Sequence, residues 1–235
     1  MYRGPTVVWV VSITRPISKA IAAILCLLAV TTTIALAQTV QVQSASALGN
    51  KDPDKSETSI GDLVADAVRN ALRTDIAFIA ASELKPKDPP FPPGKISSAD
   101  IASLVSYADD PLAVLQLPGK SVRQALERAI SIYPQPNLGF LQVSGLKFTF
   151  NPSKPSGERV VSVTVGNSPL TDDAVYTVGV TNSMANGALG YWKVWNESNI
   201  KERRPNLNIP TAIEMFFKAN PKIDYSIQDR IAVVK

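Results

Sequence analysis

Histidine is absent from the 235 residues of this chain, and that absence excludes much of the chemistry that it could otherwise perform. Without histidine, neither a Ser-His-Asp nor a Cys-His catalytic arrangement can form, and imidazole ligands for a metal are missing. The single cysteine, Cys26, lies in an apolar N-terminal stretch, so the rest of the chain has no thiol nucleophile and no thiolate ligand. We therefore expect no metal and no other cofactor.

Three pairs of carboxylates have a spacing that could serve acid–base catalysis: Asp109 with Asp110, Asp172 with Asp173, and Asp62 with Asp66. The first two pairs fall in predicted turns, where Asp commonly bonds to the nearby backbone. The third pair lies four residues apart near the start of a predicted helix, where negative charge is favourable without any catalytic role. We assign no catalytic residue to these pairs.

One nucleophile pattern remains, because Ser82 and Lys85 match the S-x-x-K spacing of Ser–Lys enzymes. That chemistry requires a helix, so that the lysine lies one turn after the serine on the same face. Pro86 follows directly and Pro89 comes soon after, so no helix can continue through this segment. The pattern therefore predicts no catalytic site.

We expect one domain of mixed α/β class, from about residue 56 to 235, with helices packed on mixed sheets. This domain would position the candidate side chains described above. Apolar spacing predicts helices from residue 58 or 59 to 73, from 97 or 98 to 105, over 121–133 and over 211–219. Strands are predicted over 76–81, 112–117, 146–150, 160–165, 175–181 and 230–234. The polar residues 38–55 indicate a linker, and the proline-rich residues 85–94 an irregular loop. The charged run 201–204 is typical of a solvated loop.

The first 37 residues have the layout of a secretory signal peptide. Arg15 and Lys19 precede an uncharged run over 20–37, which ends in the A-x-A sequence of Ala35 to Ala37. The run is also long enough to be marginal as an uncleaved N-terminal anchor, so both alternatives stay open. Either one predicts an extracytoplasmic protein (secreted, periplasmic or in the cell envelope) that contacts a membrane only if this segment is retained.

The net charge gives no indication of nucleic-acid binding. The chain has 24 basic and 20 acidic residues, and three of the basic ones (Arg3, Arg15 and Lys19) belong to the leader, which leaves 24 − 3 = 21 against 20. A nucleic-acid-binding surface needs a clear excess of basic residues.

Several motifs, in order along the chain, resemble the C-terminal domain of the 5′-nucleotidase and UDP-sugar hydrolase family. Residues 57–67 resemble its E-x-x-[LI]-G-[ND]-L-x-x-D-A opening, and residues 139–146 its G-x-[FL]-L-Q-V-[SG]-G-[LI] segment. Further matches lie at 75–79, 94–101 and 115–119, and the likeness spans about residues 56–235. The resemblance implies a mixed α/β fold that, in the family, follows a metallophosphatase domain and holds the nucleotide while the other domain performs catalysis.

The family's substrate-binding positions are mostly substituted in this chain. By the resemblance, Ala80 replaces an asparagine, Lys85 an arginine, Leu189 an aspartate, and Ala108 and Ser183 the two aromatic rings that sandwich the base. Lysine keeps a positive charge but cannot form the bidentate hydrogen bonds that arginine makes to a phosphate. A stacked ring contributes about 1–3 kcal/mol per base, so the resemblance implies a degenerate pocket with weak nucleotide affinity.

These observations predict an exported, stand-alone domain that is non-catalytic by itself and acts as a ligand-binding or interaction module. Its ligand is unknown, and a nucleotide-like molecule is one option. Alternatively, the chain is the substrate-binding subunit of a hydrolase whose metallophosphatase domain is a separate partner chain. Four aromatic residues could line a contact surface or pack in the core: Tyr133, Tyr191, Trp192 and Trp195.

Overall fold

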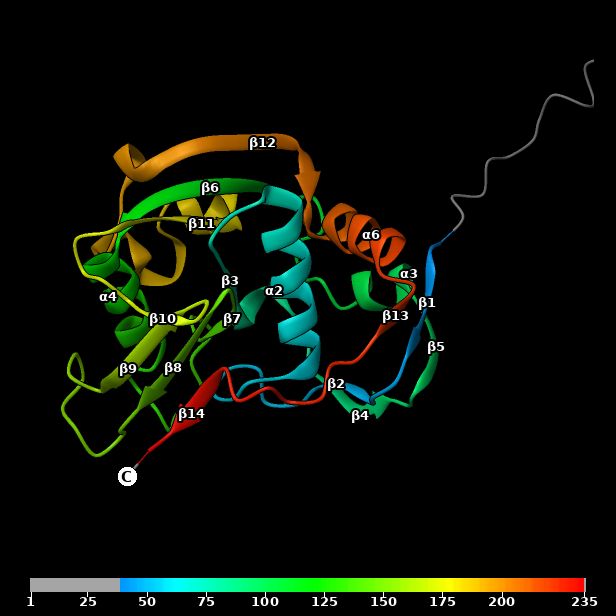
Figure 1. Cartoon of the computed structure of the whole chain (residues 1–235), viewed down its shortest axis with the longest axis horizontal. Helices are drawn as coiled ribbons and strands as arrows, with labels where there is room; N and C mark the ends of the chain where they lie inside the picture. Colours follow the sequence, from blue (N-terminus) through cyan, green and yellow to red (C-terminus); the bar gives the residue numbers. More distant parts are fainter. Residues whose placement is uncertain (1–38, 235) are drawn as a thin grey trace, which may run out of the picture. The chain divides into compact units, whose positions relative to one another are not determined.

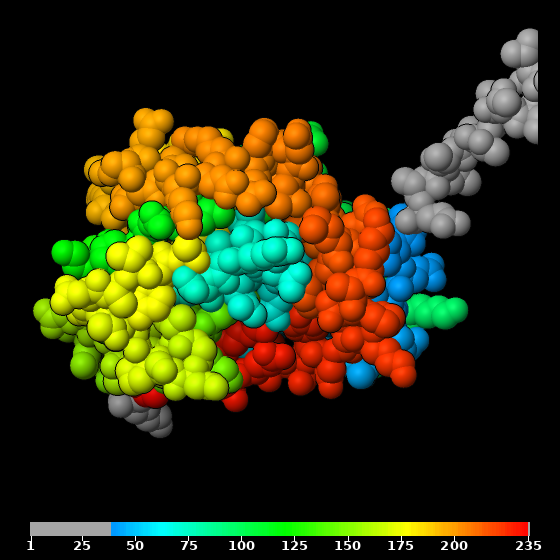
Figure 2. Space-filling view, turned by 45° about the horizontal axis from the view of Figure 1, so that its top comes forward, coloured from blue at the N-terminus to red at the C-terminus, as the bar shows by residue number. Residues whose placement is uncertain are grey.

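The structure, a computed structural model, describes residues 39–234, so the predicted leader and Cys26 lie outside the described residues. Figure 1 shows helix α2 (Ser59–Leu72) at the centre, with a five-stranded sheet on one side and smaller sheets and helices around it. In the space-filling view, atoms of the α2 region (cyan) reach the surface beside the C-terminal segment (red) (Figure 2).

Helix α2 forms where the apolar spacing predicts it. The side chain of Thr58 caps the first turn by accepting a hydrogen bond from Gly61 N at 3.0 Å. The helix ends at Arg73, whose left-handed backbone (φ 54°) lets its N–H bond to the carbonyls of Arg69 and Asn70. Gly61 is required by packing, because a Cβ there would lie 2.4 Å from Oε1 of buried Gln142.

The five-stranded sheet separates two hydrophobic cores. Its order is β12 (Ile200–Asn208), β6 (Pro111–Pro118), β11 (Val175–Thr181), β3 (Ile76–Ala80) and β7 (Leu141–Ser144), with β11 and β3 parallel and the other neighbours antiparallel. Successive strand residues point to opposite faces. In β3, Phe78 therefore packs in the first core, whereas Ala77 and Ile79 pack in the second.

Helices cover both faces of this sheet. Helix α4 (Gly119–Ala129) contributes Val122 and Leu126 to the first core. Helices α2, α3 (Ser98–Ala102) and α6 (Ile209–Ala219) enclose the second core. The remaining helical turns are α5 (Asn182–Ala185), η1 (Ala81–Glu83), η2 (Ala188–Lys193) and η3 (Glu197–Asn199).

Three smaller sheets complete the described part of the chain. One has the order β10 (Ser168–Pro169), β9 (Val160–Val165), β8 (Leu146–Phe150) and β14 (Ile231–Val233). Another has the order β13 (Lys222–Ile223), β1 (Gln41–Ser44) and β5 (Gly94–Ser97), and the last pairs β2 (Leu48–Asn50) with β4 (Lys87–Phe91). Helices packed on several mixed sheets confirm the predicted fold class.

Residues 38–55 differ from the expected linker, because β1 and β2 lie within them. In β1, Val42 and Ser44 are buried while Gln41 and Gln43 are exposed, and Leu48 of β2 is fully buried in the second core. The alternation of a half-buried strand is present, but glutamines on the outer face make the composition look like that of a linker. Residues 39–55 belong to the same compact unit as the rest of the domain.

Two other segments that the sequence assigns to loops also form strands. Residues 87–91 form β4, which pairs with β2 alone. Proline is tolerated in such an edge strand because few of its backbone N–H groups have to donate to a neighbouring strand. The charged residues 201–204 keep exposed side chains, as expected, but their backbone pairs with β6 as part of β12. Charged side chains on such an outer strand discourage pairing with another chain. Within residues 39–234, no helix has the length and apolar character required to cross a membrane.

Candidate functional site

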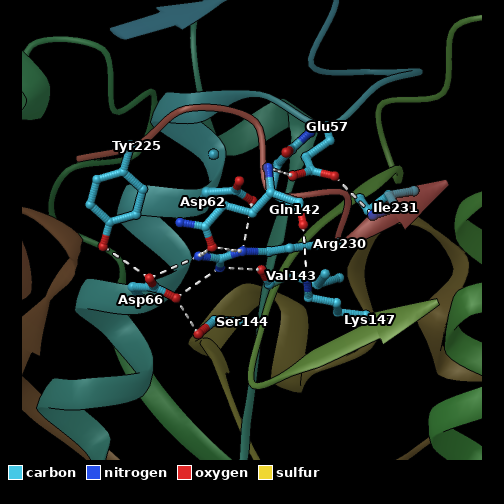
Figure 3. Close-up of polar contacts among 12 residues, drawn as sticks. Glu57, Asp62, Asp66, Gln142, Val143, Ser144, Lys147, Tyr225, Arg230 and Ile231 are labelled. Carbon is cyan, nitrogen blue, oxygen red and sulfur yellow. Dashed lines mark hydrogen bonds and ion pairs between the residues drawn. The ribbon is translucent and has the colours of Figure 1, made fainter. Parts of the chain in front are cut away.

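The two carboxylates of α2 meet the guanidinium of Arg230, which approaches from the C-terminal end of the chain (Figure 3). Nη1 and Nη2 of Arg230 each donate to one oxygen of Asp66, at 2.8 and 2.9 Å, in a two-pronged ion pair. The hydroxyls of Ser144 and Tyr225 also donate to Asp66, at 2.5 and 2.9 Å. Nε of Arg230 lies 3.5 Å from Oδ1 of Asp62.

Asp62 and Asp66 have opposite protonation behaviour, although one arginine faces both. Asp62 is completely buried and neither of its oxygens has a hydrogen-bond partner among the described residues. Its burial raises its pKa to about 9, more than the positive charge of Arg230 lowers it. For Asp66, the effect of burial is outweighed by the hydrogen bonds and charge of Arg230, so the pKa of Asp66 is lowered. At neutral pH, Asp62 is therefore protonated and Asp66 ionised.

Glu57 completes this cluster by binding the backbone of the same C-terminal segment. Its carboxylate accepts hydrogen bonds from Gln228 N at 3.0 Å and from Ile231 N at 2.9 Å. We call Glu57, Asp62, Asp66, Tyr225 and Arg230 the C-terminal clamp. The clamp joins the end of the domain to its central helix, and the carboxylates of α2 act in it as structural groups.

A pocket of about 300 Å³ lies where two of the five predicted binding positions meet. It brings together Ser183, at the start of α5, and Leu189, in η2, as the resemblance implies. The full lining consists of Ser82, Glu83, Tyr107, Asp110, Leu138, Ser183, Met184, Ala188 and Leu189. The site is thus assembled from η1, the segment before β6, the segment before β7, and the α5–η2 region.

The other predicted positions do not line this pocket. Ala80 is fully buried at the end of β3, where its N–H donates to Glu83 Oε2 at 2.7 Å. Lys85 is exposed, and its ammonium group donates to the carbonyl of Ser103 at 3.2 Å. Ala108 is exposed outside the lining. Residues 82–85 do not form the helix that Ser–Lys chemistry requires, since η1 ends at Glu83.

Tyr107 lines the pocket although it is not among the positions that the resemblance implies. Its side chain is 62% exposed and lines the pocket, although the motif placed the corresponding aromatic position one residue later, at Ala108. Tyr107 is the only aromatic residue between Phe91 and Tyr133, so a one-residue change of register could have found it. The pocket lining therefore contains one aromatic ring, and Ser183 supplies no second ring.

The charged groups of the pocket are acidic. Glu83 is buried at its wall, where Oε1 accepts a hydrogen bond from the Thr181 hydroxyl, and burial raises its pKa to about 7. Asp110 accepts a hydrogen bond from Ser183 N at 3.2 Å. Among the described residues that line the pocket, none is a lysine or an arginine.

A larger depression of about 570 Å³ lies beside the C-terminal clamp, but its polar side chains already have partners. Arg69 donates to the Ser144 hydroxyl at 2.7 Å, and Lys147 to the Gln228 carbonyl at 2.9 Å. Asp75 accepts from the Thr177 hydroxyl at 2.7 Å. Arg69 and Lys147 keep further N–H groups that could meet a ligand. None of the predicted binding positions lines this depression, whereas Ser183 and Leu189 line the smaller pocket, which is therefore the candidate site.

The aromatic residues near the pocket mainly belong to the core. Tyr191 and Trp195 are buried and stacked, with ring centroids 4.8 Å apart, and Tyr133 packs edge-on against Phe150. Trp192 is 65% exposed. In residues 39–234, no three His, Cys, Asp or Glu side chains are grouped so that they could hold a metal ion.

Comparison with known proteins agrees with this architecture. The sequence profile of the family described as 5′-nucleotidase, C-terminal domain, matches residues 31–197, more than half of the chain. The chain therefore belongs to this family.

Relatives of known function are much longer than this chain. The trifunctional nucleotide phosphoesterase YfkN of Bacillus subtilis is 26% identical over 188 residues, which cover 76% of this chain and 12% of that protein. A snake venom 5′-nucleotidase from Naja atra is 26% identical over 162 residues, covering 61% of this chain and 30% of that protein. The crystal structure of a 5′-nucleotidase precursor from Thermus thermophilus has a TM-score of 0.74 and 27% identity, over 92% of this chain and 43% of the other.

Proposed function

We propose that this chain is an exported ligand-binding or interaction domain that performs no hydrolysis by itself. The observation that carries the proposal is the pocket lined by Ser183 and Leu189, which has one aromatic ring and no basic residue in its lining. Phosphate binding in proteins generally relies on Arg, Lys or backbone N–H groups, and the lining residues include neither basic type. The absence of histidine from the whole sequence supports a non-catalytic role.

Export is supported by the N-terminal sequence and by the venom relative. The first 37 residues have the charged, apolar and A-x-A segments of a signal peptide. N-terminal sequencing of protein recovered from the cell envelope or the medium tests the proposal, and cleavage predicts Gln38 as the first residue. Retention of residues 1–37 in the membrane fraction would favour the anchor, and recovery from the cytosol would contradict export.

A second candidate function is that of a substrate-binding subunit. The family membership favours it, since the matched relatives are named as nucleotide phosphoesterases and nucleotidases and are longer proteins. In this case a separate chain would supply a metallophosphatase domain. A neighbouring gene encoding D-x-H and G-N-H motifs would favour the subunit, and hydrolysis that appears only when both chains are mixed would establish it.

An activity assay distinguishes both proposed functions from that of an enzyme that is active by itself. We expect the purified chain to show no hydrolysis of AMP, UDP-glucose or p-nitrophenyl phosphate with Mn²⁺, Co²⁺ or Zn²⁺ added, because the metal ligands of a dinuclear centre are missing. Metal-dependent turnover that stays with the chain through purification to homogeneity would contradict the proposal.

A further inference from the structure

The candidate pocket has an apolar side that is open to a ligand. Tyr107 and Leu138 line it and are 62% and 63% exposed, which is unusual for two large apolar side chains at one depression. Met184, Ala188 and Leu189 extend the apolar lining. A volume of about 300 Å³ is at the lower end of the range for small-molecule sites, so it suits a ring with a short substituent.

The polar side of the pocket is formed by carboxyl groups, with buried Glu83 in its wall and Asp110 in its lining. Two arginines that bond to residues in or beside the lining already have partners and do not themselves line the pocket. Arg128 donates to the Leu189 carbonyl at 2.6 Å, and Arg203 donates to Asn182 and, at 2.9 Å, to Asn186. An anionic group entering the pocket would therefore meet two carboxyl groups and no lining cation.

We infer that this pocket binds a small ring-bearing amine in its protonated form, and that it rejects nucleotide phosphates. The ammonium group would pair with Asp110, which keeps a free carboxylate oxygen beside the one that accepts from Ser183 N. The ring of Tyr107 would offer its electron-rich face to the cation or stack on the ligand ring. The inference rests on the proposed binding function and names the ligand class for that same pocket.

Calorimetric titration of the full chain with two matched probes tests the inference. Phenethylamine carries a ring and a cation, and 3-phenylpropanoate carries the same ring and an anion. We expect the amine to bind at least tenfold more tightly than the carboxylate, because the pocket has acidic and no basic lining residues. Equal binding of both probes, or no binding of the amine at 1 mM, a concentration chosen for about −4 kcal/mol of affinity, would overturn the inference.

Variants identify the groups responsible. Asp110→Asn can still accept the hydrogen bond from Ser183 N, and we expect it to weaken amine binding about fivefold to tenfold, the scale of one partly exposed ion pair. Asp109→Asn is the matched control, because Asp109 is exposed and lies outside the lining, and it should leave the affinity unchanged. Tyr107→Ala should weaken both probes. An Asp110→Asn variant that binds the amine as well as the original chain would contradict the assigned role.

Failure of the inference can be distinguished from failure of the proposed function. Binding of AMP instead of the amine, without hydrolysis, would overturn the ligand class and leave a non-catalytic binding domain. Hydrolysis of AMP by the pure chain would overturn the proposed function itself, whichever probe binds.

Discussion

Replacement of Asp62 by Asn should stabilise the protein at neutral pH. Asp62 is completely buried without a hydrogen-bond partner among the described residues, and its pKa is raised to about 9. In the unfolded chain an aspartate has a pKa of about 3.9, so keeping the proton on Asp62 in the fold at pH 7 costs up to about 4 kcal/mol, three pH units at about 1.4 kcal/mol each. Asparagine has nearly the same shape and is neutral at every pH, so the variant avoids this cost.

The stability gain from Asp62→Asn should depend on pH, and this dependence makes the test specific for the proton on Asp62. Because the folded-state pKa is raised, the contribution of Asp62 to stability is fully present below about pH 4 and is lost as the pH rises toward about 9. The gain from Asp62→Asn should therefore be near zero at pH 4, increase by up to about 1.4 kcal/mol per pH unit, and reach at most about 4 kcal/mol at pH 7.

Urea unfolding, followed by tryptophan fluorescence at pH 4, 5, 6 and 7, measures this gain. A variant that is less stable than the original chain at pH 7 would refute the reasoning. A gain that does not change with pH would also refute it, because it would have a cause other than the proton on Asp62.

Three further outcomes follow from the same structure. Asp66→Asn should lower the free energy of unfolding by about 3–5 kcal/mol at pH 7, because it leaves Arg230 without its ion pair. Urea unfolding below pH 4 should show a smaller difference between the variant and the original chain, because the pKa of Asp66 is lowered in the fold. Leu48→Ala should cost about 2–5 kcal/mol in thermal or urea unfolding, whereas exposed Gln43→Ala should cost little, and equal small effects would mean that residues 41–50 are a linker after all. AMP should bind no more tightly than about 1 mM by calorimetry, equivalent to about −4 kcal/mol, and a dissociation constant below about 50 μM would show that the pocket retains nucleotide affinity.

Much of the fold could be predicted from the sequence because its main elements have strong local patterns. The apolar spacing of α2 and the alternation in β8 appear in the structure, and strands β8, β9 and β11 have the expected bounds. Strands β1, β2, β4 and β12 were not predicted, because they are short, polar on one side or rich in proline. Strand β7 was missed since it has four residues, all buried, and shows no alternation.

The candidate sites were harder to predict because they join segments that are distant in sequence. Ser183 and Leu189 line the pocket as the resemblance implies, whereas the ring expected one residue later is Tyr107. A motif fixes the order of residues but not which of two neighbours points into the pocket. The partner of Asp66 is Arg230, 164 residues away, and no local pattern indicates that pairing.

The C-terminal clamp also constrains when the chain can fold. Arg230 is the charge partner of Asp66, and β13 supplies a parallel neighbour for β1, so the first and the last parts of the described chain complete each other. A chain that emerges from its N-terminal end, from a ribosome or through a membrane pore, has Asp66 available long before Arg230. Until Arg230 arrives, α2 carries an ionised carboxylate without its partner, and contacts of such long sequence separation form slowly. Completion of this domain is therefore a late event, which has to wait for the segment that carries Arg230.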